Sequence, residues 1–268
     1  MRGDELRYVL LIFSMIFATG CGAKDESALP QASGPSEVSS PASAGAKTVD
    51  LTLAGSVRGK IIFEGTTPEP KQLSVKGNPE CAVLHPGGMI ASEELVVKES
   101  VLQNVFVYVK QGLEGYSFTL PVSAHVVENK RCAYVPHVSG VMVGQEVQFL
   151  NQDPTLHNIH SYPKNSKAFN LGLPLVGMKQ TKKFDSPEVM VPLKCDVHPW
   201  MLGYVGVLPH PYFQVSAADG TFELKNLPPG EYVVEAWHEK LGVRTQNVTI
   251  TPNETKEIEF KFEAQPSS

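Results

Sequence analysis

The sequence predicts an all-β protein. Apolar and β-branched runs of strand length recur from residue 51 onward, and Gly, Pro, Asn or Asp bounds each of them. No stretch places apolar residues at a long helical spacing, so any helix should be brief. The 268 residues, 42% of them hydrophobic, suffice for one or two domains with their own cores. The clearest runs are residues 59–63, 105–109, 146–150, 205–208, 232–236 and 247–250.

The charge and the motif content exclude several classes of function. A formal net charge of −5 argues against a nucleic-acid partner, because such partners call for a basic face. We find no Ser-His-Asp order, no phosphate-binding loop and no pair of carboxylates typical of hydrolysis. The sequence therefore does not predict an enzyme.

The N-terminus has the features of a targeting segment. Arg2 and Arg7 precede an apolar run over residues 8–17 that is too short to span a bilayer, and small residues then lead to Cys21. This pattern resembles the signal peptide of bacterial lipoproteins over residues 1–21, which implies that Cys21 carries lipid and anchors the protein to a membrane. The alternative is a plain secretory signal that is cleaved nearby. Both alternatives place the mature protein outside the cytoplasm, facing the periplasm or the cell surface.

Residues 22–50 are rich in Ser, Ala, Pro and Gly and show no apolar period. Such a segment cannot bury enough surface to fold, so we expect a flexible linker. Its root-mean-square reach would be roughly 30 Å, which suits a domain that swings from an anchor.

The residues with the most specific chemistry are His157 and a compact run that holds Cys195, His198 and Met201. One thiolate, two imidazoles and one thioether are the ligands of blue copper centres, in which a weak axial thioether completes a trigonal plane. We therefore expect one copper ion that alternates between Cu(I) and Cu(II). Zinc is the rival metal, although it rarely accepts a thioether.

The surroundings of these ligands resemble the cupredoxins, in particular amicyanin and plastocyanin. Residues 143–151 read like the strand that enters the copper site, 153–160 like the loop with the first histidine, and 203–208 like the closing strand. The spacing Cys-x-x-His-x-x-Met is similar to the ligand loop of amicyanin. The resemblance implies a Greek-key cupredoxin β-sandwich over residues 117–210.

The resemblance also implies roles for the residues beside the ligands. Asn158 would tie the two ligand segments together by hydrogen bonds. Independently of the resemblance, Pro199 lacks the N–H that could otherwise bond to the thiolate and so affect the reduction potential. His160 is the alternative to His157 as a ligand, but positions three apart in a strand point to opposite faces. Trp200 is expected either in the core or beside an exposed edge of His198, where an apolar patch would receive redox partners.

The segments on either side resemble a second family. Residues 55–61 and 104–109 are similar to the opening strands, and 219–232 to the second half, of carboxypeptidase regulatory-like domains, which have a transthyretin-like β-sandwich. The resemblance implies a sandwich built from residues 51–116 and 211–263, with the cupredoxin inserted between its halves and a tail over 264–268. Insertions succeed at loops whose ends lie close together. The alternatives are two consecutive sandwiches or one extended cupredoxin.

With Cys21 assigned to lipid and Cys195 to metal, Cys81 and Cys132 remain. An even pair in an oxidising compartment favours a disulfide. The alternative is a second metal site in which Cys81 acts with His85, or Cys132 with His137.

These predictions favour an exported blue copper protein that passes single electrons between redox proteins such as a cytochrome. One alternative is a copper carrier or storage protein, since the same ligands would serve. The other is a carbohydrate or surface binding module in which the cupredoxin is only structural.

Overall fold

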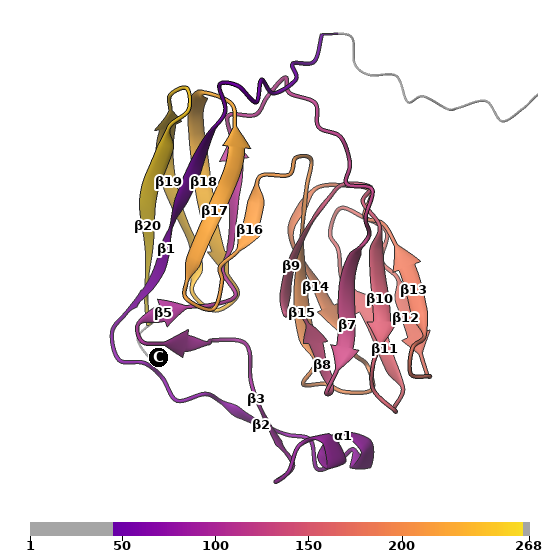
Figure 1. The fold of residues 1–268 in the computed structure, drawn as a ribbon. Coiled ribbons are helices and arrows are strands. Elements are labelled where there is room, and N and C mark those ends of the chain that lie inside the picture. The colour runs from indigo at the N-terminus through magenta and orange to yellow at the C-terminus, as the bar shows by residue number, and fades with distance from the viewer. Residues whose placement is uncertain (1–44, 265–268) are drawn as a thin grey trace, which may run out of the picture. The chain divides into compact units, whose positions relative to one another are not determined.

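The computed structural model describes residues 45–264, and it confirms the all-β prediction (Figure 1). The strands fall into two groups. We call β7–β15 the central sandwich, and β1, β4–β6 and β16–β20 the flanking sandwich. Each of the six runs predicted from the sequence overlaps a strand, and the single helix of the described residues, α1 (Pro79–Leu84), is brief as expected.

Two sheets form the flanking sandwich. Their order is β17-β1-β5-β4, with β20 also on β1, and β16-β6-β18-β19. Phe260 and Phe262 of β20 alternate with exposed charged residues, so that strand faces the core on one side and solvent on the other. The strands are β1 (Gly55–Glu64), β4 (Val97–Lys98), β5 (Val101–Leu102), β6 (Phe106–Gln111), β16 (Phe213–Val215), β17 (Thr221–Leu227), β18 (Gly230–His238), β19 (Gly242–Ile250) and β20 (Thr255–Glu263).

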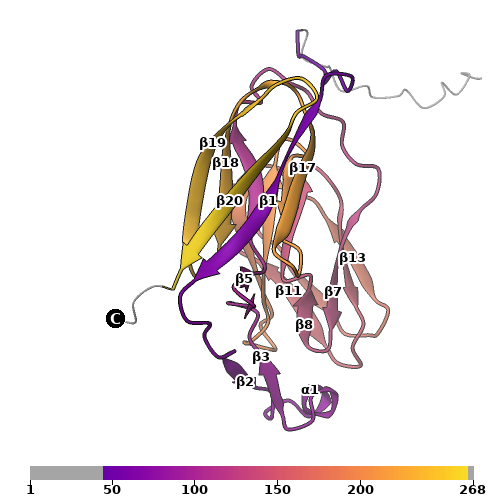
Figure 2. The same ribbon diagram turned by 60° about the vertical axis from the view of Figure 1, so that its left-hand side comes forward.

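Strand β1 joins parts of the chain that are far apart in sequence. It pairs in parallel with β20 from Ser56 opposite Thr255 to Glu64 opposite Glu263, and antiparallel with β17 (Figure 2). The flanking sandwich is thus completed by strands from both sides of the central sandwich in the sequence, which is the pairing that an insertion requires.

The central sandwich also has two sheets, in the orders β13-β10-β7-β8 and β12-β11-β14-β15-β9. Its core is separate from that of the flanking sandwich and contains Phe149, Phe184 and Ile159. The strands are β7 (His125–Lys130), β8 (Ala133–Val135), β9 (Val138–Met142), β10 (Val147–Asn151), β11 (His157–Ser161), β12 (Asn170–Leu173), β13 (Lys179–Lys182), β14 (Glu188–Lys194) and β15 (Leu202–Leu208).

The two sandwiches pack together where an aromatic ring lies against two glycines. Gly140 of β9 and Gly206 of β15 are direct partners in register, and a Cβ atom on either would lie 2.5–2.6 Å from the ring of Phe106 in β6. Phe106 is fully buried there, beside Met190 and Phe213. The two glycines therefore provide the space in which this ring packs.

Between β1 and β4 the chain leaves the flanking sandwich as the α1 segment, residues 72–91. Strands β2 (Gln72–Ser74) and β3 (Met89–Ala91) pair antiparallel, and α1 lies between them. Asn78 caps the helix because its side chain accepts the Cys81 N–H, and Pro79 follows in the first turn, where its missing N–H costs nothing. Cys81 is joined to Cys132 by a disulfide, so the segment is covalently tied to the central sandwich.

The predicted signal peptide, Cys21, most of the predicted linker and residues 265–268 lie outside the described residues. At the end of the predicted linker, Lys47 donates to the Gly115 carbonyl at 2.7 Å and its own carbonyl accepts the Ser117 N–H. Within residues 45–264, no helix combines the length and apolar character that crossing a bilayer requires.

Candidate metal centre

Two segments of the central sandwich bring the predicted ligands together. His157 is the first residue of β11, while Cys195, His198 and Met201 lie on the loop between β14 and β15. Strands β11 and β14 pair antiparallel, so the loop comes next to His157. The loop closes on itself because the Met201 N–H donates to the His198 carbonyl and the Cys195 N–H donates to the Met201 carbonyl. The β scaffold therefore sets the positions of the ligand segments.

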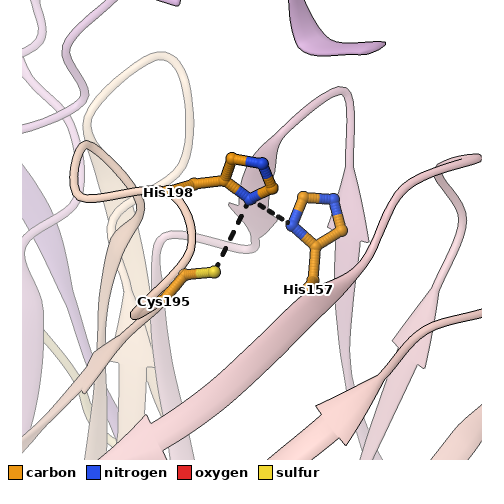
Figure 3. Close-up of side chains that lie close together, drawn as sticks. All are labelled: His157, Cys195 and His198. Atoms are coloured by element: carbon orange, nitrogen blue, oxygen red, sulfur yellow. Dashed lines mark hydrogen bonds between the residues drawn. The ribbon is translucent and has the colours of Figure 1, made fainter. Parts of the chain in front are cut away.

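The three nitrogen and sulfur side chains converge on one point (Figure 3). The Nδ1 atoms of His157 and His198 are 2.9 Å apart, and the Cys195 Sγ lies 3.6 Å from the His198 Nδ1. All three donor atoms lie within 4.8 Å of one another, and both histidines are 0% exposed. Met201 is buried in the same core cluster as Cys195. A single ion could therefore reach all three donor atoms.

The remote nitrogen of each imidazole also has a partner. His157 Nε2 lies 3.0 Å from the Asp153 Oδ2, and Asp153 in turn accepts the N–H groups of Arg131 and Cys132, both at 2.7 Å. His198 Nε2 lies 2.8 Å from the Asn78 Nδ2 in the α1 segment. Such partners hold a ligating ring in place and leave the other nitrogen, here Nδ1, facing the metal.

The electrostatics of the site favour a thiolate. Burial opposes ionisation of Cys195, but hydrogen bonds with His157 and His198 and with backbone N–H groups outweigh it and lower the pKa of the thiol to about 6. Burial also opposes a charge on His157, yet its contact with Asp153 raises the pKa of the imidazole. A thiolate is the form of cysteine that binds metals.

Asn158 connects the two ligand segments. Its Oδ1 accepts the Asp196 N–H at 2.7 Å and lies 3.3 Å from the Cys195 Sγ, while its Nδ2 donates to the Asp196 carboxylate. By accepting the Asp196 N–H, this amide fixes the loop that carries the sulfur relative to the strand that carries His157. It does what the resemblance implied for this residue.

The donor set fits copper. A buried thiolate with two imidazoles is a combination that both copper and zinc accept, and a thioether in the same loop favours copper. Copper bound there would be held by His157, Cys195 and His198, with Met201 as the predicted fourth ligand. Zinc remains the rival on the three donors alone.

The alternatives considered from the sequence fare differently. His160 lies outside the group, since its Nδ1 contacts the Asp196 carboxylate at 3.1 Å and its side chain is 30% exposed. A second metal site on Cys81 or Cys132 is wrong, because the disulfide consumes both thiols. His85 contacts the Arg131 carbonyl and His137 contacts Glu239.

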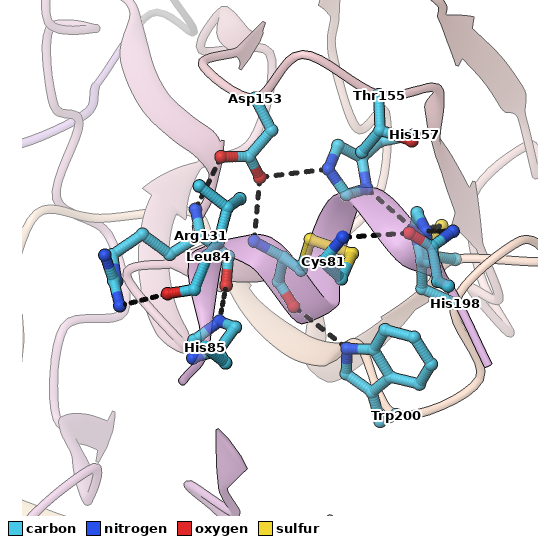
Figure 4. Close-up of a disulfide and its surroundings, with 12 residues drawn as sticks. Cys81, Leu84, His85, Arg131, Asp153, Thr155, His157, His198 and Trp200 are labelled. Carbon is cyan, nitrogen blue, oxygen red and sulfur yellow. Dashed lines mark hydrogen bonds and ion pairs between the residues drawn. A yellow bond between two sulfur atoms is a disulfide. The ribbon is translucent and has the colours of Figure 1, made fainter. Parts of the chain in front are cut away.

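The expectation of an exposed His198 edge is also wrong. His198 is 0% exposed, and α1 lies beside it (Figure 4). The Asn78 Nδ2 of the α1 segment lies 2.8 Å from the His198 Nε2. Trp200 lies against the His198 ring at 5.1 Å between centroids, and its Nε1 donates to the Cys132 carbonyl. Pro199 is exposed in the same loop, and its effect on the sulfur stays a prediction.

Sequence reasoning missed two residues of the site, Asp153 and Asn78. The start of α1 has a recognisable pattern: a capping amide at Asn78, a proline in the first turn and then the acidic Glu80. This helix could therefore have been predicted from the sequence. The contact between Asn78 and His198 could not have been predicted, because 120 residues separate the two.

No protein-family model matches the chain, and no curated protein is similar to it. Among solved structures, an oxidised mutant of amicyanin is 22% identical over 34% of this chain and 88% of its own, with a TM-score of 0.29. A purple cupredoxin from Nitrosopumilus maritimus is 27% identical over 31% of this chain and 98% of its own, with a TM-score of 0.27. A copper-containing nitrite reductase from Thermus scotoductus is 16% identical over 55% of this chain but only 28% of its own, with a TM-score of 0.31.

Proposed function

We propose that the protein is a type 1 copper protein that carries single electrons. The observation that supports this most directly is the buried convergence of Cys195, His157 and His198 on donor atoms within 4.8 Å of one another. Bound copper would supply a one-electron couple tuned by the Cys195 thiolate and by the Met201 thioether.

Residues around the ligands would keep the site rigid and exclude water from it. Asp153 and Asn78 hold the two rings, and Asn158 holds the loop that carries the sulfur, so little rearrangement should accompany a change of charge at the site. Complete burial of both histidines excludes water from their ligating nitrogens. Such a site favours electron transfer over catalysis, since no described donor atom is open to a substrate.

We also propose that the protein works outside the cytoplasm, anchored through lipid on Cys21, and exchanges electrons with redox proteins such as a cytochrome. The motivation is the lipoprotein-like N-terminus together with a disulfide, which persists in oxidising compartments.

Copper loading of the mature protein tests the proposal. We expect one copper ion per chain, an intense blue colour from the thiolate-to-copper transition, and a reversible one-electron couple by voltammetry. A colourless protein that binds Cu(I) tightly without a reversible couple would support the carrier or storage alternative instead. Preferential binding of zinc from an equal mixture of the two metals would contradict both.

A further inference from the structure

The turn that joins β7 to β8 has a backbone conformation that its residues rarely adopt. Lys130 pairs with Ala133, so only Arg131 and Cys132 make the turn, and their φ angles are 54° and 56°. Asn, Asp or Gly normally occupies the positions of such a two-residue turn, because a larger side chain is strained at positive φ. A strained backbone of this kind persists only where its surroundings hold it in place.

Contacts from three directions hold this turn (Figure 4). The Asp153 carboxylate accepts the N–H groups of both turn residues, each at 2.7 Å. The Trp200 Nε1 donates to the Cys132 carbonyl at 3.1 Å. The Cys132 side chain forms the disulfide with Cys81 of α1. Because this last link is covalent, it is the strongest of the contacts that keep the turn in its conformation.

The residues that hold the turn also contact two of the predicted metal ligands. The Asp153 Oδ2 accepts the Cys132 N–H and lies 3.0 Å from the His157 Nε2. The Trp200 ring, which donates to the Cys132 carbonyl, lies against the His198 ring with the centroids 5.1 Å apart. The N–H and the carbonyl of this one cysteine are therefore each a single side chain away from a ligand histidine.

The disulfide also joins the turn to a second residue beside His198. Asn78 caps α1 by accepting the Cys81 N–H at 2.9 Å, and its Nδ2 lies 2.8 Å from the His198 Nε2. Both cysteines are 0% exposed, and the Trp200 side chain packs against the buried cluster that contains them. One cysteine of the bond therefore contacts Asn78 and the other contacts Trp200, the two residues that lie against His198.

We propose that the disulfide between Cys81 and Cys132 positions the ligands of the metal site. It holds Cys132 at positive φ, the conformation in which the N–H meets Asp153 and the carbonyl meets Trp200. Without the bond the turn should relax, and the outer contacts of both ligand histidines should loosen with it. This inference rests on the proposed function, because it gives the disulfide a part in binding copper in addition to its part in stability.

Two variants that both lack the disulfide test the role of the turn. Cys81→Ala/Cys132→Ala keeps a Cβ atom at residue 132, whereas Cys81→Ala/Cys132→Gly places there the residue that adopts positive φ without strain. We expect the alanine variant to bind copper about tenfold more weakly than wild type, and the glycine variant to recover about threefold of that loss. The thiolate-to-copper absorption and the copper hyperfine splitting should shift in the alanine variant and return towards wild type in the glycine variant.

Hydrogen exchange of the metal-free proteins reports on the turn itself. The amide of residue 132, which donates to Asp153, should exchange faster in the alanine variant than in wild type, and more slowly again in the glycine variant. Unchanged exchange of the amides of β10, which lies between β7 and β13, shows that the sandwich is folded.

Trp200→Phe takes the place of the alanine variant if that variant does not fold. It keeps the disulfide and an aromatic ring beside His198, but it removes the donor to the Cys132 carbonyl. Its copper absorption and hyperfine splitting should therefore shift from those of wild type.

Failure of this inference differs in its readout from failure of the proposed function. A wild-type protein that binds no copper, or binds it without the blue colour, overturns the proposed function whatever the variants do. With a blue wild type, an unchanged affinity and spectrum in the alanine variant, or an unchanged spectrum in Trp200→Phe where it takes that place, overturn the inference alone. Equal losses in the alanine and glycine variants also overturn it, because the disulfide would then act without the turn.

Discussion

Two histidines of β11 that are three residues apart have opposite surroundings. His157 is fully buried and faces His198 through Nδ1, whereas His160 is partly exposed and bound to Asp196. We expect His157→Ala to abolish the blue colour of the copper-loaded protein, while His160→Ala keeps it. Absorption spectra of both variants, with circular dichroism to show that each is folded, check the assignment. A blue His157→Ala protein would reverse it.

Asp153 contacts both the predicted ligand His157 and the backbone beside the disulfide. It accepts the N–H groups of Arg131 and Cys132 and also contacts His157. We expect Asp153→Asn to weaken metal affinity about 10- to 100-fold, as is typical when the outer partner of a ligating histidine is changed. Competition with a chelator of known affinity measures this. Asp185→Asn, an exposed aspartate on the same sandwich, is the control and should bind metal like wild type.

Among the elements, β6, β9 and β15 fix the packing of one sandwich on the other. A Cβ on Gly206 would lie 2.5 Å from the Phe106 Cζ and 2.9 Å from the Met190 Sδ. We expect Gly206→Ala to lower the free energy of unfolding by about 1–3 kcal/mol through overpacking. Gly172→Ala in β12, where a Cβ meets nothing within 4 Å, should change it far less.

The measurement is chemical denaturation of both variants and of Gly206→Ala combined with Phe106→Leu. If the clash with the ring is the cause, the smaller side chain should recover part of the loss, which appears as a coupling free energy in the double-mutant cycle. Strictly additive effects of the two substitutions would show that another contact is responsible.

An element could be predicted from the sequence where the residues that determine it are close together in the chain. The strands were predictable because apolar runs and their Gly or Pro boundaries are local. Three of the four ligands lie within seven residues, so their motif was visible as well. The contact at His198 was not, because it joins Asn78 to a distant loop. The glycines under Phe106 were equally hidden, since nothing in a strand pattern says which aromatic ring will need their space.

Across residues 45–264, three histidines are buried outside the metal site, and protonation of these histidines changes the stability of the fold in opposite directions. Burial lowers the pKa of His210 and of His238 to about 4 each. For His137, burial also disfavours the charge, but the contact with Glu239 outweighs it and raises the pKa. His210 and His238 therefore destabilise the fold as the pH falls, and His137 has the reverse effect.

His210 allows this dependence to be isolated, because it lies in the flanking region, away from the metal ligands and 6% exposed. Its folded pKa of about 4 is below the ordinary value of 6.5, so the unfolded chain binds the proton first. Its contribution to stability is complete above pH 6.5 and is lost as the pH falls towards 4. Between pH 7 and pH 5 we expect this one group to cost about 2 kcal/mol of unfolding free energy. His210→Asn keeps an acceptor for the Tyr212 N–H at the place of Nδ1 but cannot titrate, so urea denaturation should show a smaller loss over this range than in wild type. Equal losses in the two proteins would mean that His210 does not stay neutral in the fold as its burial requires.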